Sequence, residues 1–140
     1  MNIKMILLSN DFYSKYDAAN YPEIMRKDTR PYACFAVKID NHLFAIPIRH
    51  HINHAYAFMT TNDCDLDYSK AVVIDDPTYI SSIPAIIDTT EWNIIKTSAN
   101  TIFFEFRKYV RQYRRALKNP TNPRSAAILR YSTLQYFNLD

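Results

Sequence analysis

The chain has 140 residues, of which 48% are hydrophobic and 22% are charged, and its formal net charge at pH 7 is +3. This length fits a single domain over residues 1–140, and no stretch approaches the roughly 20 apolar residues of a membrane-spanning helix. Glycine is absent, which excludes the glycine-rich phosphate loops and dinucleotide fingerprints of many nucleotide-cofactor enzymes.

The N-terminal segment predicts a strand followed by a short helix. Residues 4–8 are apolar, and no small-residue cleavage site of a secretion signal follows them, so we expect a first strand and a cytoplasmic protein. Ser9 or Asn10 can cap a helix that carries Phe12, Tyr13 and Tyr16. Residues 20–30 are polar and interrupted by proline, which predicts a surface loop whose basic residues could reach a ligand: Arg26, Lys27 and Arg30.

The middle of the chain predicts an antiparallel sheet. Residues 32–39 and 43–48 are β-branched and aromatic runs, and the Asp40-Asn41 pair between them predicts a hairpin turn. Residues 55–60 continue the pattern as a third strand. Further strand segments at residues 70–74, 78–80 and 86–87 bring the expected sheet to five or six strands. Cys34 lies in an apolar run and Cys64 in an acidic loop, so we expect two reduced thiols.

Beyond Asp88 the hydrophobic period changes from two to about 3.6, which predicts a long amphipathic helix, with room for a break. Its apolar stripe consists of Trp92, Ile95, Ala99, Ile102, Phe103, Phe106, Val110, Tyr113 and Leu117. Asn119-Pro120 ends it, and Asn122 with Pro123 starts a second helix. The buried face expected for that second helix consists of Ala126, Ala127, Tyr131 and Leu134. The predicted fold class is α+β, a mainly antiparallel sheet with helices packed on it.

Charge is divided unevenly along the chain. Residues 1–95 carry 8 Lys and Arg against 12 Asp and Glu, whereas residues 96–140 carry 9 against 2. Glu105 is the single acidic residue in this part of the long helix. The basic residues recur there at helical intervals and are Arg107, Lys108, Arg111, Arg114, Arg115 and Lys118. A solvated helix face is one explanation, but the excess of arginine favours contact with the backbone of a nucleic acid.

Three of the four histidines fall in the run Arg49-His50-His51-Ile52-Asn53-His54, directly after an apolar segment. In an extended segment His50 and His54 point the same way and His51 opposes them. No carboxylate or cysteine follows at ligand spacing, so metal binding is the weakest interpretation. Acid–base or phosphate-binding work, with Arg49 as an anion ligand, is the leading hypothesis, and a structural role remains open.

Three short motifs carry a resemblance to a known family. Arg30-Pro31-Tyr32 opens a strand, Ala45-Ile46-Pro47-Ile48 precedes the histidine run, and Leu66-Asp67-Tyr68-Ser69-Lys70 precedes another apolar strand. In this order, followed by a basic helix and an aromatic-rich tail, they resemble the toxins of type III toxin–antitoxin systems. The TenpN branch, related to ToxN and AbiQ, is the most similar, and the resemblance covers nearly the whole chain.

This resemblance implies a fold similar to the MazF and Kid toxins and an endoribonuclease that needs no metal or other cofactor. Such a toxin cuts cellular mRNA and its own repeat RNA precursor. The ribose 2′-hydroxyl attacks the adjacent phosphate and leaves a 2′,3′-cyclic phosphate and a 5′-hydroxyl. The implied partner is a small repeat RNA antitoxin that holds the toxin in an inactive assembly, with no membrane involved; a role in phage defence is also implied.

The residue roles follow from the chemistry of this reaction, since ToxN-like proteins carry a Thr-Ser-Pro-Lys string where this chain has Arg49-His50-His51-Ile52. The reaction needs a base, an acid and a cation. His50 and His54 are the candidates for base and acid, and Arg49 for the cation. Lys70 is a further candidate as acid or charge stabiliser, Ser69 could bind phosphate, and Tyr32 could contact a base or phosphate.

Two other functions remain open at this stage. A non-catalytic module that binds single-stranded RNA would use the same basic helix together with the tyrosines, of which the chain has 11. A histidine-cluster metalloenzyme would hold zinc or manganese.

Overall fold

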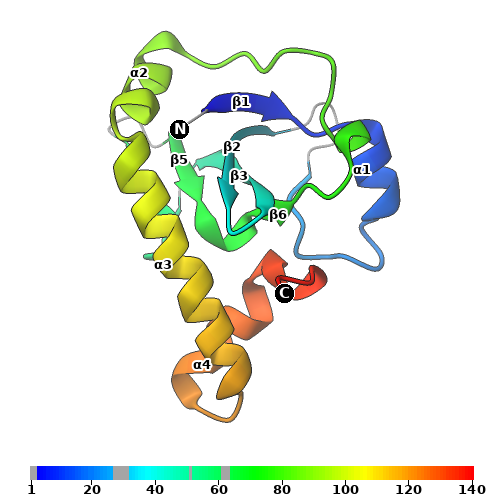
Figure 1. Cartoon of the computed structure of the whole chain (residues 1–140), viewed down its shortest axis with the longest axis vertical. Coiled ribbons are helices and arrows are strands. Elements are labelled where there is room, and N and C mark those ends of the chain that lie inside the picture. Colours follow the sequence, from blue (N-terminus) through cyan, green and yellow to red (C-terminus); the bar gives the residue numbers. More distant parts are fainter. Residues whose placement is uncertain (1–2, 27–31, 51, 61–63) are drawn as a thin grey trace.

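The computed structural model describes residues 3–26, 32–50, 52–60 and 64–140, which form a sheet flanked by helices (Figure 1). The described strands make a six-stranded sheet in the order β1-β2-β3-β5-β4, with β6 paired to β3. Every strand pair is antiparallel. The strands are β1 (Lys4–Leu7), β2 (Ala33–Ile39), β3 (His42–His50), β4 (Ala57–Phe58), β5 (Cys64–Asp67) and β6 (Val72–Val73). The predicted α+β class and strand number are therefore confirmed.

The predicted hairpin between β2 and β3 is present. Asp40 and Asn41 adopt φ angles of 50° and 71°, in the left-handed region that Asn and Asp tolerate better than other non-glycine residues. Along β2, Phe35, Val37 and Ile39 face one side of the sheet and Cys34 and Ala36 the other. Both sides of this strand are buried, which explains its nearly continuous apolar sequence.

Three strand predictions are wrong. The third strand beside β3 is β5, an acidic segment, whereas the segment predicted for that place supplies only the short edge strand β4. Residues 78–80 belong mainly to a 3-10 helix, η2 (Pro77–Tyr79), with a single bridge from Ile80 to Leu8. Residues 86–87 form no strand and lie in the long segment that leads from η2 over β1 to the next helix (Figure 1).

Two of the helices, α1 and α4, begin at caps that the sequence predicts. Ser9 accepts a hydrogen bond from the backbone of Phe12 and starts α1 (Asn10–Lys15). The long C-terminal helix is broken at Ser98, the residue that joins α2 (Thr89–Thr97) to α3 (Ala99–Lys118). Asn122 caps α4 (Pro123–Tyr131), which lies beside the end of α3, and two further 3-10 helices are η1 (Tyr68–Lys70) and η3 (Thr133–Tyr136) (Figure 1).

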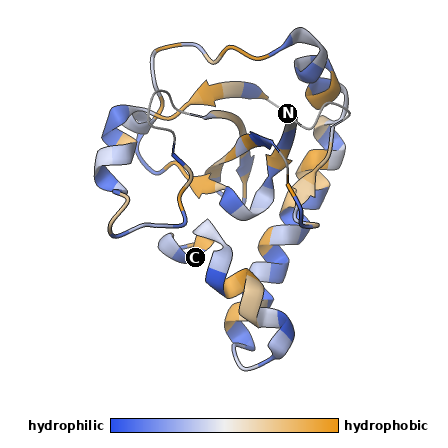
Figure 2. Cartoon of the chain, turned by 180° about the vertical axis from the view of Figure 1, so that it is seen from behind, coloured by the Kyte–Doolittle hydropathy of each residue, from blue (hydrophilic) through white to orange (hydrophobic). Residues whose placement is uncertain are grey.

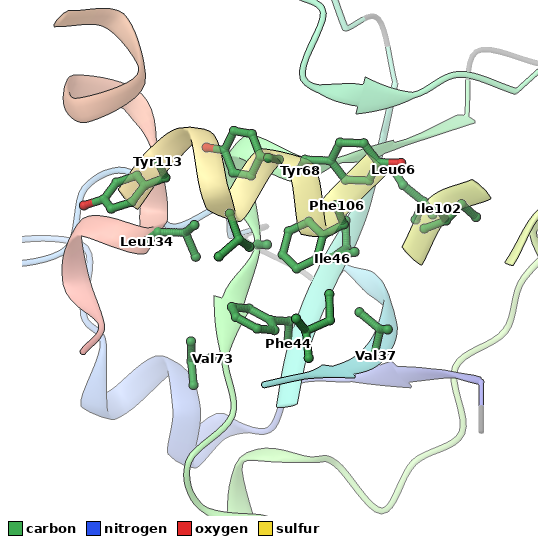
Figure 3. Packing of buried hydrophobic residues seen from close by; sticks show 14 of the residues in the cluster. Val37, Phe44, Ile46, Leu66, Tyr68, Val73, Ile102, Phe106, Tyr113 and Leu134 are labelled. Atoms are coloured by element: carbon green, nitrogen blue, oxygen red, sulfur yellow. The ribbon is translucent and has the colours of Figure 1, made fainter. Parts of the chain in front are cut away.

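Two apolar clusters hold the layers together. In the larger one, Phe44 and Ile46 of β3 pack beneath Phe106 of α3, with the Phe44 and Phe106 rings 5.0 Å apart (Figure 3). The smaller cluster lies on the other side of the sheet, where Phe12 of α1 is fully buried. Hydrophilic and hydrophobic positions lie next to each other along α3 (Figure 2), as expected for a helix with one face on a core.

The buried faces of the C-terminal helices differ from prediction in detail. Leu117 of α3 is exposed, and Tyr109 and Ala116 are buried instead. On α4, Ser125 and Ile128 are buried, while Ala126, Ala127 and Tyr131 are exposed; Leu134 is buried but belongs to η3. The reason is tertiary: α4 folds back along α3, and the contact between the two helices selects the Ser125 and Ile128 stripe.

Candidate functional site

Arg49 and His54 meet at the carboxylate of Asp67. Arg49 Nη1 lies 3.0 Å from Asp67 Oδ2, and His54 Nε2 lies 3.3 Å from Asp67 Oδ1. The Asp67 side chain has no exposed surface, whereas those of Arg49 and His54 are 40% and 29% exposed. One buried negative charge therefore holds two groups that both reach the surface.

The local fold places this carboxylate. Asp67 ends β5 and caps η1, so that its Oδ1 accepts hydrogen bonds from the backbone N–H of Ser69 at 3.0 Å and from Ser69 Oγ at 2.6 Å. An aspartate that bonds the backbone two residues on is a standard turn former. Across the sheet Arg49 pairs with Asp65, and because side chains alternate along β5, Asp67 lies on the same face as Arg49.

Both ring nitrogens of His54 are engaged. Nδ1 accepts a hydrogen bond from the backbone N–H of Tyr56 at 3.1 Å, which assigns the proton of the neutral ring to Nε2. That nitrogen faces Asp67 and lies 3.4 Å from Ser69 Oγ. In this geometry the ring can donate from Nε2 and has no free lone pair with which to accept a proton.

Lys70 brings a second cation to the site. Its Nζ lies 3.0 Å from Glu23 Oε1 and donates to the backbone carbonyl of Tyr131 at 2.9 Å. The side chain is 13% exposed. Lys70 is therefore a cation fixed by an ion pair and a hydrogen bond at the edge of the site. It belongs to η1 and not to the start of a strand.

Arg49, His54, Ser69 and Lys70 line one cavity of about 320 Å³, which we call the Asp67 cavity after the buried carboxylate that the first three contact. Its floor comes from the ends of β3 and η1, and its walls come from Tyr109 of α3 and from α4 with the turn after it. The lining residues are Arg49, His54, Tyr56, Ser69, Lys70, Tyr109, Ala127, Ile128, Tyr131 and Ser132. The volume is near the lower end of the range of small-ligand sites, roughly 300–1,000 Å³.

The buried tyrosine in the wall of the cavity, Tyr109, remains neutral. Burial raises the pKa of Tyr109 well above its ordinary value, and its hydroxyl donates to Ser132 Oγ at 2.7 Å. The neighbouring Tyr68 also has a raised pKa, chiefly through burial and then through its hydrogen bond to Glu105 at 2.8 Å. Tyr109 can thus shape the cavity and cannot serve as a base at neutral pH.

Two predicted catalytic residues lie elsewhere. His50 is exposed at the end of β3, and because it follows Arg49 in a regular strand its side chain points to the opposite face of the sheet. The predicted pairing of His50 with His54 does not occur in the cavity, since His54 reaches it from the irregular segment after β3. Tyr32 lines a separate small cavity whose wall also includes Lys70. His51 is outside the described residues.

Some of the predicted RNA-binding residues are bonded within the protein, and others are exposed to solvent. Arg26 is packed inside the fold, with its guanidinium bonded to the carbonyl of Tyr16 and lying 5.6 Å from the centre of the Tyr13 ring. Arg114 donates to the carbonyl of Leu139 at 2.7 Å and lies 4.0 Å from Asp40. Lys27 and Arg30 fall outside the described residues. The exposed cations of α3 are Arg107, Lys108, Arg111, Arg115 and Lys118.

Sequence reasoning placed Arg49, His54, Ser69 and Lys70 in one site, and the structure brings these four together. It missed Asp67, which joins Arg49, His54 and Ser69, and it missed the aromatic wall of Tyr56, Tyr109 and Tyr131. A signal for Asp67 existed: an aspartate two residues before a serine is typical of a side-chain-capped turn, which would have oriented its carboxylate.

Comparison with protein-family models, with curated proteins and with solved structures finds no match for this chain. Among the described residues, no helix combines the length and apolar character needed to cross a bilayer. The same residues contain no group of three or more His, Cys, Asp and Glu side chains arranged to hold a metal ion.

Proposed function

We propose that the protein is a metal-independent endoribonuclease, the toxin of a type III toxin–antitoxin system. The observation that supports this most is the Asp67 cavity, where Arg49, His54 and Ser69 contact one buried carboxylate and Lys70 lines the same space. Two cations beside a hydroxyl and an imidazole are suited to a phosphodiester whose charge increases in the transition state. The sequence resemblance supplies the reaction type and the RNA antitoxin.

In the proposed reaction the ribose 2′-oxygen forms a bond to phosphorus and the bond from phosphorus to the 5′-oxygen breaks. Arg49 and the Nε2–H of His54 stabilise the negative charge of the phosphorane. Ser69 Oγ takes the proton of the 2′-hydroxyl while its own proton passes to Asp67, along the 2.6 Å hydrogen bond. Lys70 protonates the leaving 5′-oxygen, and solvent returns the protons to their starting groups.

This assignment gives His54 the role of a hydrogen-bond donor, because its Nδ1 is occupied by the Tyr56 backbone. Replacement by glutamine tests the role, since the amide nitrogen of glutamine can donate from a similar position but cannot transfer a proton. His54→Gln should retain a substantial part of the cleavage rate that His54→Ala loses. Equal loss in both variants would show that His54 transfers a proton and that the proposed roles are wrong.

Expression of the chain without its RNA partner tests the function itself. We expect growth arrest and RNA fragments that end in 2′,3′-cyclic phosphate, both insensitive to chelators and absent in Arg49→Ala. Chelator-sensitive cleavage would contradict the metal-free mechanism. A short tandem repeat followed by a terminator directly upstream of the gene is expected for the antitoxin, and its absence would argue against the type III assignment.

A second candidate function is a non-catalytic module that binds single-stranded RNA. One observation favours it: both nitrogens of His54 and the ammonium of Lys70 are already bonded within the protein. A binding module needs only the positive charge and the aromatic wall. Tight, salt-sensitive binding of RNA with no cleavage over several hours, by purified protein, would favour this function over the nuclease.

A further inference from the structure

A second cavity, of about 380 Å³, lies between α3 and α4 and adjoins the Asp67 cavity. The two share Tyr56 and Ile128 as lining residues, so they are neighbours along one surface. Figure 1 shows the place, where α4 folds back beside the end of α3. We call it the helix-hairpin cavity; its lining comprises Tyr56, Gln112, Arg115, Ala116, Asn119, Asn122, Arg124, Ser125 and Ile128.

The charge of the helix-hairpin cavity is positive and uncompensated. Arg115 and Arg124 are exposed, and neither forms an ion pair with an acidic side chain of the described chain. No acidic residue lines the cavity. The large cavity at the C-terminus differs in this respect, because Asp40 and Asp140 line it together with Arg114 and Lys118, so that acidic and basic side chains balance there. An anion is therefore favoured more strongly in the helix-hairpin cavity than in the C-terminal one.

Amide side chains give the same cavity donors and acceptors. Gln112 and Arg115 lie three residues apart on one face of α3, and Asn119 is the C-cap of that helix. Asn119 donates from Nδ2 to the carbonyl of Arg115, so its amide oxygen can accept a further bond. Asn122 accepts the backbone N–H of Arg124, so its Nδ2 can donate. Such groups are those that read the edges of an unpaired base.

Tyr56 stands between the two cavities. Its ring centre is 6.0 Å from that of His54 and 5.5 Å from that of Tyr109, and it lines both spaces. Adjacent cavities of about 320 and 380 Å³ that share an aromatic wall fit successive units of a single strand better than one compact ligand. An aromatic side chain between two such units is a common feature of single-strand binding sites.

We propose that the helix-hairpin cavity is a second nucleotide subsite for single-stranded RNA, adjacent to the one at Asp67. Arg115 and Arg124 neutralise its phosphate, and Gln112 with Asn119 contacts its base. This inference rests on the proposed function, since it takes RNA as the ligand. It adds a consequence: sequence preference beside the cleaved bond depends on α3 and α4 and not on the histidine run.

The test measures binding of 2′-O-methyl oligonucleotides, which lack the attacking hydroxyl and stay intact. Oligonucleotides of two and of eight nucleotides are titrated into each protein at several salt concentrations. The proteins are the unaltered chain, the double variant Arg115→Gln/Arg124→Gln, and a control with the same change of charge, Lys4→Gln/Lys38→Gln. Lys4 and Lys38 are exposed on β1 and β2 and line neither cavity. Thermal unfolding confirms that each variant is folded.

The unaltered protein should bind the eight-nucleotide RNA more tightly than the two-nucleotide RNA. We expect the ratio of these two affinities to be about tenfold smaller in Arg115→Gln/Arg124→Gln. The slope of log affinity against log salt should become shallower by about 1.4, because each phosphate contact on a single strand contributes about 0.7. Arg115→Lys/Arg124→Lys keeps both charges and should keep most of the slope. The lysine control should match the unaltered protein in both quantities.

The outcomes separate the two proposals. If the unaltered protein binds the longer RNA and both glutamine double variants change equally, the second subsite is wrong while RNA binding stands. If the unaltered protein binds neither oligonucleotide, the proposed function and this subsite both fail. A loss confined to the arginine variant, with retention in the arginine-to-lysine variant, supports the subsite.

Discussion

Replacing Asp67 by asparagine tests whether one buried carboxylate organises the site. The two oxygens of Asp67 receive contacts from Arg49 Nη1 at 3.0 Å, from the Ser69 backbone N–H and Oγ at 3.0 and 2.6 Å, and from His54 Nε2 at 3.3 Å. Asparagine keeps the shape of the side chain but removes its charge. It also places an amide N–H₂ where one oxygen accepted a bond, so that a donor faces a donor.

The magnitude follows from burial. Removing one partner of a fully buried ion pair costs about 3–5 kcal/mol. Here only Asp67 is fully buried, and water can reach the 40% and 29% exposed side chains of Arg49 and His54. We therefore expect a loss of roughly 2–3 kcal/mol in the free energy of unfolding, which includes weakened charge-assisted hydrogen bonds. For a chain of this length that corresponds to a fall in Tm of roughly 6–12 °C.

The assay is thermal unfolding at pH 7, followed by circular dichroism, together with the rate of RNA cleavage. Asp65→Asn is the matched control, because Asp65 is also buried on β5 but accepts its hydrogen bond from the backbone N–H of Thr60, whereas Asp67 contacts Arg49, His54 and Ser69. It should lose stability and retain cleavage, whereas Asp67→Asn should lose both. A Tm within about 2 °C of the unaltered protein would refute the view that Asp67 holds the site together.

Three further predictions test particular features of the structure. His50→Ala should retain most of the cleavage rate that His54→Ala loses, because His50 lies on the opposite face of β3 from Arg49; similar initial rates for the two variants would contradict this placement. Asn41, at φ 71°, should tolerate glycine, whereas Asn41→Ala should cost about 1 kcal/mol in urea unfolding, and a neutral alanine would argue against the turn. In a Cys64→Ser background, the buried Cys34 thiol should react with a thiol reagent at pH 8 only after unfolding. Burial raises the pKa of the Cys34 thiol from 9.0 to about 12. The protonated thiol therefore contributes its full stability below pH 9, and this contribution is lost as pH rises toward 12. Cys34→Ala should reduce that alkaline loss of stability when unfolding is measured as a function of pH.

The fold was predictable wherever the local signal and the tertiary environment agree. The β2–β3 hairpin has apolar strands joined by two residues that accept positive φ, and α4 has Asn122 followed by Pro123 at its start. β5 was not predictable, because its Cys-Asp-Leu-Asp sequence has low strand propensity, and Leu66 is the one apolar core residue among Asp65, Leu66 and Asp67, whose burial is described. Asp65 is stabilised by the backbone N–H of Thr60, and Asp67 by its turn with Ser69 and by Arg49 of β3, partners that a search for alternating apolar residues does not detect.

The site was half predictable for a related reason. Arg49, His54, Ser69 and Lys70 stand out because polar, basic and titratable residues follow apolar strands. The sequence prediction placed His50 beside Arg49 and His54, whereas β3 stays regular through His50 and residues 52–56 are irregular. The alternation of side chains therefore separates His50 from Arg49, and the bend returns His54 to the face that Arg49 occupies.

The ion pairs of Arg49 with Asp67 and of Lys70 with Glu23 leave both cations able to bind an anion as well. Of the guanidinium nitrogens of Arg49, only Nη1 contacts Asp67 among the described contacts. Lys70 uses two of its three N–H donors, one on Glu23 and one on the carbonyl of Tyr131. Each cation thus keeps at least one donor for a ligand while its own ion pair remains intact. A phosphate can bind without the cost of exposing Asp67, because the buried carboxylate stays neutralised. The phosphate of the proposed RNA ligand can therefore bind while the ion pairs Arg49–Asp67 and Lys70–Glu23 stay in place.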